Sequence, residues 1–269
     1  MTILVTGATG NVGRSVVDQL VEAGQRVRAL TRNPKEAQLP DAVEVVHGNL
    51  AHIDTLPAVF EGVDSMFLFP TPVLNTAPAV VDAAKRAEVR RIVLLSSSRP
   101  FESIERAIEE SGLEWTHVRP GEFAVNKLDY WAKSIREEGV ARMAYPEARG
   151  VPVHEADIAA VAVAALLDGR HAGRVYDVTG PEALTQREQV QAISEGIGKP
   201  VEFQAVTPDE ARDYMTAQGW PREIADYYLA YLAEWDVHPP KALRTVEEVT
   251  GRPARTLAEW AADHADSFR

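Results

Sequence analysis

The sequence predicts an α/β protein with a doubly wound parallel sheet, followed by a small, mainly helical C-terminal lobe. Two observations support this fold class. An apolar segment, Ile3–Val5, leads directly into three glycines with the spacing Gly-x-x-Gly-x-x-Gly, and an amphipathic pattern of helical period follows them. Beyond this motif, apolar strand-like segments and helical patterns alternate up to Val118, which is typical of right-handed βαβ units.

The elements follow from local patterns in chain order. Short apolar runs, several of them apolar on both faces, predict strands at Ile3–Val5, Val27–Leu30, Val43–Val46, Ser65–Phe69, Ile92–Leu95 and Trp115–Val118. Helical spacing between them predicts helices that include Ala79–Ala87 and Ser103–Glu110. After Arg119-Pro120-Gly121 this regularity ends. The pattern then predicts strands at Val151–Val153, Arg174–Val178 and Val201–Ala205, and helices at Ile158–Leu167, Arg187–Glu195, Pro208–Gln218, Arg222–Glu234 and Leu257–Ala265. We expect a first domain over residues 1–150 and a smaller lobe over residues 151–269 that packs on it.

Each of the three glycines meets a different steric need. Gly7 permits a tight turn after the strand, Gly10 lets a diphosphate approach the backbone, and Gly13 lets the helix lie close to the sheet. The N-terminus of the helix presents free N–H groups and a positive dipole end to phosphate oxygens. A glycine-rich turn between a strand and a helix therefore predicts a dinucleotide site in a Rossmann fold, with contacts from Gly7, Thr9, Gly10, Asn11, Val12 and Gly13.

The end of the second expected strand indicates which dinucleotide binds. In NAD-selective folds an acidic residue there bonds the ribose hydroxyls, whereas this chain reads Thr31-Arg32-Asn33-Pro34. Arg32, with Asn33 beside it, is suited to pair with a 2′-phosphate or to stack on adenine. We therefore expect NADP(H) in preference to NAD(H). An exposed arginine in a solvated turn is the alternative interpretation.

Further cofactor contacts are expected where other strands end, because ligands of open α/β sheets bind at the carboxyl ends of the strands. Asn49 follows the third strand, where its side chain suits the adenine edge. Phe69-Pro70-Thr71 follows the fourth strand, at the level of the nicotinamide ribose. The set expected from these loops is Asn49, Leu50, Phe69, Pro70, Thr71, Ser96, Ser97 and Pro120.

Composition excludes several classes of function. The chain has 269 residues, of which 45% are hydrophobic and 25% charged, as is ordinary for a globular protein. A net charge of −12 opposes non-specific binding to nucleic acids or anionic membranes, and the lack of cysteine excludes disulfides and thiolate chemistry. The seven histidines show no paired metal-ligand spacing, so no metal site is expected. The first strand begins at residue 2, so we expect no signal peptide, and no apolar run is long enough to predict a membrane span. We therefore expect a cytoplasmic protein, and we expect it to be a monomer or a homodimer.

Seven segments together resemble the NmrA-like atypical short-chain dehydrogenase/reductases. In chain order they are TGATGNVG, VRALTRNP, GNLAHIDTL, RRIVLLSSS, SGLEWTHVRPGEF, HEADIAAVA and GRVYDVTGPEALT. The resemblance covers nearly the whole chain, thins after about Pro240, and is greatest for the branch of quinone and triphenylmethane-dye reductases. It implies a Rossmann domain with a smaller C-terminal lobe and binding of NAD(P)(H). The family includes reductases, biosynthetic enzymes and cofactor-sensing regulators without turnover.

One departure from the wider superfamily concerns proton transfer. Its members use Tyr-x-x-x-Lys, in which the lysine lowers the pKa of the tyrosine, but no tyrosine of this chain has a lysine four residues later. Tyr130 and Lys133 are one residue short of that spacing. Ser98 is the nearest counterpart of the superfamily's catalytic serine, suited to orient substrate or nicotinamide, or else to bond backbone groups at a strand end. Ser98 and Tyr130 are therefore the candidate catalytic residues.

Two other groups of side chains have two interpretations each. His154-Glu155-Ala156-Asp157 suggests acid–base chemistry, but it also suits the start of a helix, where acidic groups bond free N–H groups. An aromatic stretch over residues 220–235 predicts core packing or a dimer surface. Alternatively, it forms a wall for a flat polycyclic substrate, to which Tyr130 and Trp131 contribute from the opposite side.

These inferences favour an NAD(P)H-dependent reductase of a conjugated or aromatic ketone or quinone, such as an intermediate of aromatic natural-product biosynthesis. Hydride transfer to such an acceptor needs no acid from the protein, because water can supply the proton. The missing Tyr-x-x-x-Lys pair equally suits a non-catalytic dinucleotide redox sensor. A cofactor-retaining oxygenase-like enzyme, lyase or isomerase is a third hypothesis.

Overall fold

A computed structural model describes residues 1–97 and 101–269 of the chain. Within them, a seven-stranded sheet has the strand order β3-β2-β1-β4-β5-β6-β9, and all neighbouring strands are parallel. Strands β2 and β3 are added on one side of β1, and β4, β5 and β6 are added on its other side. The boundary between β1 and β4 is therefore the topological switch point of a doubly wound sheet. This arrangement confirms the predicted fold class.

The observed elements agree closely with the predicted ones in the first half of the chain. The strands are β1 (Thr2–Thr6), β2 (Arg26–Thr31), β3 (Glu44–His47), β4 (Ser65–Leu68), β5 (Arg91–Leu95), β6 (Glu114–Pro120), β7 (Val140–Met143), β8 (Arg149–Gly150), β9 (Arg174–Val178), β10 (Leu184–Thr185) and β11 (Glu202–Ala205). The α-helices are α1 (Asn11–Glu22), α2 (Leu56–Phe60), α3 (Ala77–Arg86), α4 (Glu102–Glu109), α5 (Lys133–Glu138), α6 (Glu155–Leu167), α7 (Gln186–Ile197), α8 (Pro208–Ala217), α9 (Arg222–Val237), α10 (Thr245–Thr250) and α11 (Leu257–Asp263).

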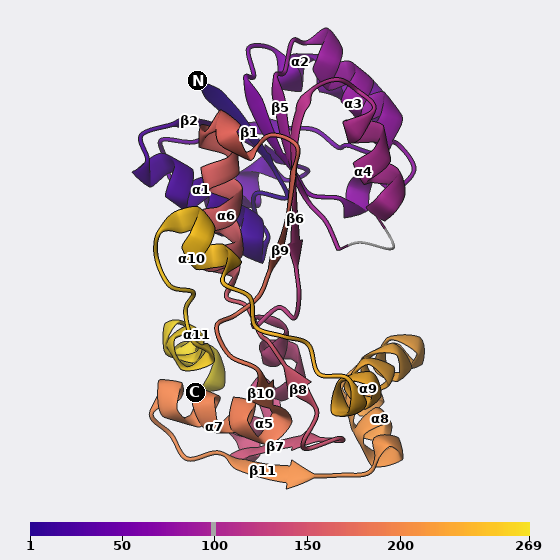
Figure 1. Ribbon diagram of the computed structural model, residues 1–269, viewed down its shortest axis with the longest axis vertical. Coiled ribbons are helices and arrows are strands. Elements are labelled where there is room, and N and C mark those ends of the chain that lie inside the picture. Colours follow the sequence, from indigo (N-terminus) through magenta and orange to yellow (C-terminus); the bar gives the residue numbers. More distant parts are fainter. Residues whose placement is uncertain (98–100) are drawn as a thin grey trace. The chain divides into compact units, whose positions relative to one another are not determined.

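The chain forms two compact units, and the first contains the seven-stranded sheet. This unit consists of Met1–Pro120, Glu155–Val178 and Thr245–Arg252. Helices α1 and α6 lie on one side of the sheet and α2, α3 and α4 on the other, while α10 packs on α6 (Figure 1). Strands β4 and β5 are buried along their whole length, which explains why their sequences are apolar on both faces.

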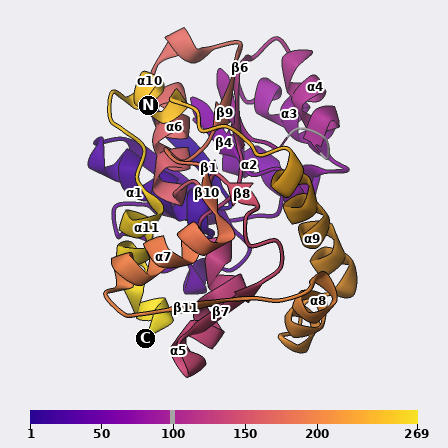
Figure 2. The same cartoon turned by 60° about the horizontal axis from the view of Figure 1, so that its bottom comes forward.

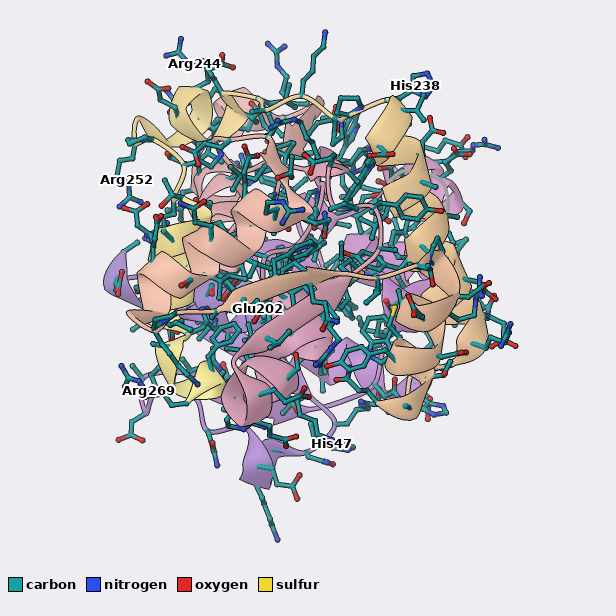
Figure 3. The ribbon with its side chains drawn as sticks, turned by 90° about the horizontal axis from the view of Figure 1, so that it is seen from below. His47, Glu202, His238, Arg244, Arg252 and Arg269 are labelled. Carbon is teal, nitrogen blue, oxygen red and sulfur yellow. The ribbon has the colours of Figure 1, made fainter. Side chains whose placement is uncertain are left out.

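The second unit has its own core and two small strand pairs. It consists of Gly121–His154, Thr179–Arg244 and Pro253–Arg269, with β7 parallel to β11 and β8 antiparallel to β10. Within this unit α7 packs against α11 and α8 against α9 (Figure 2). Polar side chains such as Glu202 and His238 are exposed at its surface (Figure 3).

The division into units differs from the predicted single boundary at residue 150. Both units are discontinuous in sequence, because α6 and β9 return to complete the first unit after the chain has entered the second. The predicted strand Val151–Val153 is replaced by β8 at Arg149–Gly150 and by a single parallel bridge between Val153 and Phe123. No helix of the described residues is long and apolar enough to cross a membrane.

Candidate functional site

The glycine turn after β1 has the geometry that a phosphate cradle requires. Gly7 has a φ of +63°, and its carbonyl oxygen accepts the N–H of Gly10 at 2.9 Å. A Cβ at Gly13 would overlap this same carbonyl oxygen, so only glycine allows α1 to lie so close to the turn. Gly10 is the N-cap of α1, and no described side chain bonds the N–H groups of the first helical turn. These N–H groups remain available to an anion.

The predicted cofactor-binding residues of this turn differ in their exposure to solvent. Thr9, Gly10 and Asn11 are exposed. Val12 is 6% exposed, because its side chain packs into the core of the first unit. Thr9 and Asn11 therefore present side chains at the helix start, whereas Val12 offers only its backbone N–H.

Thr6 fixes the loop after β4 next to the glycine turn. Its buried hydroxyl donates to the Phe67 carbonyl oxygen at 3.1 Å and accepts the N–H of Phe69 at 2.7 Å. The side chain of Phe69 consequently lies over Gly7, where an added Cβ would be 2.9 Å from the Cβ of Phe69. The structure thus brings two predicted cofactor residues together. After Phe69, Pro70 is buried and Thr71 is exposed.

The turn after β2 presents Arg32 to solvent. Arg32 is exposed, and its guanidinium group makes no hydrogen bond or ion pair within the described residues. The side-chain amide of Asn33 donates to the Glu36 Oε2 at 3.2 Å. Arg14 of α1 donates to the carbonyl oxygens of Ala37 and Gln38 at 3.1 and 2.7 Å, which ties α1 to the segment that follows the turn.

The loop after β3 is closed by its own hydrogen bonds. The Asn49 Oδ1 accepts the N–H of Ala51 at 3.0 Å, and the Leu50 carbonyl oxygen accepts the hydroxyl of Thr76 at 3.0 Å. The Leu50 side chain is buried. Leu50 is therefore a core residue, whereas Asn49 keeps its amide N–H₂ group free of hydrogen bonds to the described residues.

The serines after β5 are divided between the interior and the surface. Ser96 is 2% exposed, and its N–H donates to the Val118 carbonyl oxygen at 2.8 Å. Its hydroxyl has no hydrogen bond of normal geometry within the described residues, although it is close enough to Glu105 to help lower the pKa of that carboxyl. Ser97 is exposed, and Ser98 lies outside the described residues.

A partly buried ion pair, between Glu105 and Arg119, lies next to Ser96, and sequence analysis did not predict it. Both oxygens of Glu105, on α4, accept hydrogen bonds from Arg119 on β6, at 2.8 and 2.6 Å. Burial raises the pKa of Glu105, but the hydrogen bonds from Arg119, the nearby Ser96 hydroxyl and the nearby charges outweigh this effect, so the pKa lies below its ordinary value. The pair ties α4 to the carboxyl end of β6, where Pro120 is buried.

His117 lies beside this pair and is fully buried. Its ring stacks on Trp115 with centroids 4.5 Å apart, and its Nε2 is 3.1 Å from the Glu109 Oε1. Burial lowers the pKa of His117, and the charges of Glu105 and Glu109 offset only part of this effect. Trp115 and His117 both lie on β6, and both carboxylates lie on α4, the helix that precedes it. The sequence did not indicate this arrangement, because nothing in the local pattern shows that the His117 ring is buried.

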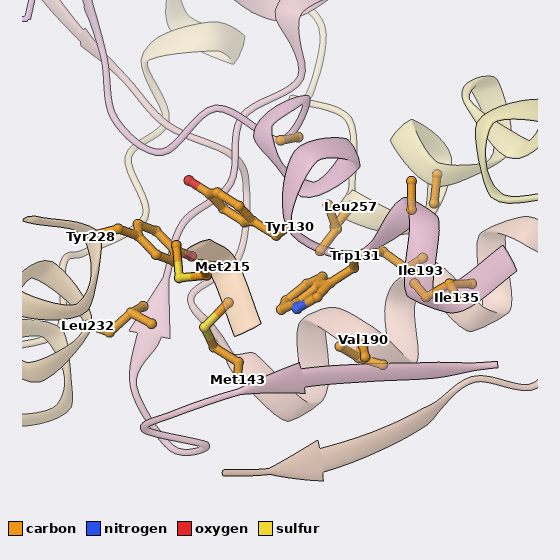
Figure 4. Packing of buried hydrophobic residues seen from close by; sticks show 14 of the residues in the cluster. Tyr130, Trp131, Ile135, Met143, Val190, Ile193, Met215, Tyr228, Leu232 and Leu257 are labelled. Carbon is orange, nitrogen blue, oxygen red and sulfur yellow. The ribbon is translucent and has the colours of Figure 1, made fainter. Parts of the chain in front are cut away.

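The second unit holds the other candidate catalytic residue, Tyr130, in an aromatic cluster. Its ring centroid is 4.4 Å from that of Tyr228 and 5.2 Å from that of Trp220. Figure 4 shows Tyr130 and Tyr228 next to one another, with Trp131 deeper in the same apolar core. Residues from the two predicted sides of the aromatic wall are thus in contact, and the core-packing interpretation applies to them.

The other aromatic residues of α9 form a separate group. The hydroxyls of Tyr227 and Tyr231 are 3.0 Å apart, and Tyr231 also makes an edge-on ring contact with Trp235. Tyr227 is 62% exposed, in contrast to Tyr228 at 8%. The stretch predicted as one feature therefore has a part that packs on the core, at the half-buried Trp220 and the buried Tyr228, and a surface part.

A second buried ion pair, between Glu122 and Lys127, lies next to Tyr130. The side chains of Glu122 and Lys127 are 5% and 0% exposed, and the Lys127 Nζ donates to the Glu122 Oε1. The Lys127 Nζ also lies 5.3 Å from the ring centroid of Tyr130 and 5.0 Å from that of Trp131. Sequence analysis missed both charged residues, because a Glu and a Lys five positions apart after a strand are usually solvent-exposed.

The His154-Glu155-Ala156-Asp157 segment contributes to the start of a helix. Helix α6 begins at Glu155, and both Glu155 and Asp157 lie in its first turn, where acidic groups favour the dipole. His154 is buried, and its Nε2 is 3.3 Å from the Asp263 Oδ2. In the part of the chain that the structure describes, no three His, Asp or Glu side chains are grouped in a way that would hold a metal ion.

Comparison with known proteins identifies the family. The profile of the NmrA-like family matches residues 1–235. A (4-alkanoyl-5-oxo-2,5-dihydrofuran-3-yl)methyl phosphate reductase of Streptomyces griseus is 41% identical and an NAD(P)H azoreductase of Xenophilus azovorans is 39% identical, each over 99% of both chains. A crystal structure of an NADPH-dependent quinone oxidoreductase of Escherichia coli superposes with a TM-score of 0.81 at 25% identity, over 98% of this chain and 99% of that one. The chain is a member of the NmrA-like family.

Proposed function

We propose that this protein is an NAD(P)H-dependent reductase that transfers a hydride to a conjugated or aromatic ketone or quinone. The observation that carries the proposal is the first turn of α1, whose N–H groups are uncapped and reach the surface at a turn that only glycine can form. A diphosphate fits such a turn. The names of the relatives support the reaction class, because each relative is a reductase or oxidoreductase by name.

The named acceptors of these relatives share one chemical property. An acylated furanone, an azo compound and a quinone all contain a conjugated, electron-poor π system that accepts a hydride. When bound, a reduced nicotinamide supplies that hydride, and water supplies the proton. The residues of this chain then bind and orient the two reactants, which is sufficient for an acceptor of this kind.

The loops at the carboxyl ends of the strands divide the binding of the cofactor among themselves. The α1 N–H groups hold the diphosphate, Asn49 donates its amide to the adenine, and Phe69 and Thr71 border the nicotinamide ribose. Ser97 and Ser98 follow β5, where the nicotinamide ring is expected. In this assignment Val12, Leu50 and Pro70 shape the loops through packing and backbone contacts.

Arg32 favours NADPH over NADH in this proposal. Its exposed guanidinium group lies just after β2, where it can form charge-assisted hydrogen bonds with a 2′-phosphate. Titration of both cofactors by fluorescence, before and after Arg32→Ala, tests the assignment. We expect the variant to bind NADPH about 10- to 100-fold more weakly and NADH unchanged, since such bonds contribute about 1.5–3 kcal/mol.

A matched control is Arg26→Ala, which removes an exposed arginine at the opposite end of the same strand. It should leave both affinities unchanged. Equal affinity of the unmodified protein for the two cofactors, unaltered by Arg32→Ala, would contradict the preference for NADPH without affecting the reductase assignment.

A further inference from the structure

The pair of Arg119 and Glu105 fixes a guanidinium group at the carboxyl edge of the seven-stranded sheet. Arg119 is the second-last residue of β6, and Glu105 lies on α4, so both belong to the first unit. The Nε and Nη2 of Arg119 donate to the two oxygens of Glu105 at 2.8 and 2.6 Å. A two-bond contact of this kind holds the plane of the guanidinium group in one orientation.

Arg119 keeps one N–H₂ group that the protein does not use. Its Nη1 makes no hydrogen bond to the described residues, and 28% of the Arg119 side chain is exposed, compared with 6% for Glu105. The buried carboxylate therefore orients the group without competing for its remaining donors. Such donors are ready to bind a ligand with little further loss of side-chain freedom.

Arg119 lies beside the end of β5. Strands β5 and β6 pair in parallel up to Leu95 and Val118, and the Ser96 N–H donates to the Val118 carbonyl oxygen at 2.8 Å. Neighbouring strands of a sheet lie about 4.8 Å apart. The proposed function places the nicotinamide ring at the end of β5, where Ser97 is exposed. Arg119 is therefore one strand away from the position expected for that ring.

The charges around Arg119 indicate which kind of acceptor it binds. Its hydrogen bonds with Glu105 are the main reason that the pKa of Arg119 is raised, and the charges of Glu105, Asp177 and Glu109 raise it further. Three carboxylates near one guanidinium group leave no excess of positive charge at this place, so a phosphate is not favoured there. A neutral carbonyl oxygen suits the unused N–H₂ group.

We propose that Arg119 donates a hydrogen bond to the carboxamide oxygen of the nicotinamide, and that Glu105 is the positioning residue that holds Arg119 for this bond. The inference rests on the proposed function for the identity of the cofactor. A bond to the carboxamide restrains rotation of the ring about its glycosidic bond. A ring held in one orientation presents one face for hydride transfer.

Calorimetric titration with two ligands tests the role of Arg119. NADPH carries the carboxamide, whereas 2′-phospho-ADP-ribose keeps the phosphates and the terminal ribose but lacks the nicotinamide ring. Arg119→Met should weaken the binding of NADPH about tenfold or more, and should leave the Kd for 2′-phospho-ADP-ribose unchanged within about twofold. The ratio of the two Kd values is measured in one protein, so a merely structural role of Arg119 would not change it.

Glu105→Gln tests the positioning role. It keeps the shape of the side chain but removes the charge that orients the guanidinium group, so the ratio should change in the same direction as in Arg119→Met. The double variant Glu105→Gln/Arg119→Met should show no larger change than Arg119→Met alone, because Glu105 acts through Arg119. The double variant leaves no unpaired buried charge, and it replaces Arg119→Met if circular dichroism shows that the single variant does not fold.

Glu114→Gln is the matched control. Arg91 and Glu114 form a comparable pair that joins the same two strands at their amino ends. Loss of this pair should lower the free energy of unfolding, and it should leave the ratio of the two Kd values unchanged.

The binding data and the turnover data lead to separate conclusions. A ratio that Arg119→Met does not change, or equal losses of affinity for the two ligands in a folded variant, would overturn the inference. Losses that multiply in the double variant would overturn the positioning role of Glu105. The proposed function is tested by turnover instead. A protein that shows the expected ratios but oxidises no NADPH with any quinone would overturn the reductase assignment and keep the role of Arg119.

Discussion

Gly13 has no room for a side chain, because a Cβ there would overlap the carbonyl oxygen of Gly7. We therefore expect Gly13→Ala to push α1 away from the turn, at a cost of about 1–3 kcal/mol in the free energy of unfolding. The N–H groups of the first helical turn would move with it, so NADPH affinity should fall at least about tenfold. Urea unfolding and calorimetric titration measure the two effects.

The control for this change is Ser15→Ala in the same helix, where the hydroxyl donates to the carbonyl oxygen of Asn11 and to no other group of the described residues. It should alter neither quantity appreciably. Full NADPH affinity in a folded Gly13→Ala protein would show that the glycine turn does not hold the diphosphate.

His117 gives the folded protein a sensitivity to mild acid. Burial lowers its pKa in the folded state below the unfolded value of about 6.5, so the unfolded chain takes up a proton first as the pH falls. This contribution to stability is complete above the unfolded pKa and is lost as the pH falls toward the folded pKa. Glu105, Glu109 and Arg119 are the charged groups that face the ring.

The measurement is the free energy of urea unfolding between about pH 7.5 and about pH 5. We expect it to decrease with falling pH in the wild type, and to decrease less steeply in His117→Gln. His52→Gln, at an exposed histidine, should keep the wild-type slope. Parallel curves for wild type and His117→Gln would contradict the assignment.

Among the helices, α11 begins with a reciprocal cap that fixes its position. The Thr256 hydroxyl accepts the N–H of Glu259 at 3.2 Å, and the Glu259 carboxylate accepts the N–H of Thr256 at 2.7 Å. Loss of this cap in Thr256→Ala should lower the free energy of unfolding by about 1 kcal/mol. Thr256→Ser keeps the hydroxyl and should restore most of it. Equal stability of the two variants would show that the cap does not stabilise the fold.

Helices and strands that have a clear hydrophobic pattern of their own were predictable from the sequence. Short strands that form only because they pair with another strand were not. The buried strands β4 and β5 and the periodic helices α3, α4 and α8 lie within about two residues of their predicted bounds. Strand β7 was missed because it is short and mixed in character, and it depends on parallel pairing with β11. The two-residue strand β8 exists only through its pairing with β10.

The candidate site shows the same difference. The glycine turn was predictable because it depends on local features alone. Gly7 needs a positive φ, and Gly13 lies close to the backbone of Gly7, only six residues earlier in the sequence. The pairs Glu105–Arg119 and Glu122–Lys127 were not predictable, because they differ from ordinary surface ion pairs only in their burial. Burial depends on how the rest of the chain packs around them. Tyr130 was singled out from the sequence, but its contact with Tyr228 joins two parts of the chain that only the tertiary fold brings together.

At the scale of the whole molecule, the first unit includes segments that lie after residue 150 in the chain. Arg91 is buried, and it donates to the carbonyl oxygens of Ala165 and Leu166 at the end of α6 as well as to Glu114. Strand β9 pairs along β6. A fragment of residues 1–150 lacks both partners and leaves a buried charge with fewer acceptors and an open sheet edge.

We therefore expect residues 1–150 alone to show no cooperative unfolding transition, and residues 1–178, which restore α6 and β9, to regain one. Circular dichroism during urea titration measures this for both fragments. A cooperative transition in the shorter fragment would show that the predicted boundary marks an independent domain.

The most direct test of the account is a single turnover without oxygen, using NADPH that carries deuterium at both C4 positions and a para-quinone. We predict that the near-ultraviolet absorbance of the reduced cofactor disappears in one exponential phase, more slowly than with unlabelled NADPH. One oxidised cofactor should form for each quinone reduced. Tight binding of NADPH with no loss of its absorbance would contradict hydride transfer and favour a protein that only senses the dinucleotide.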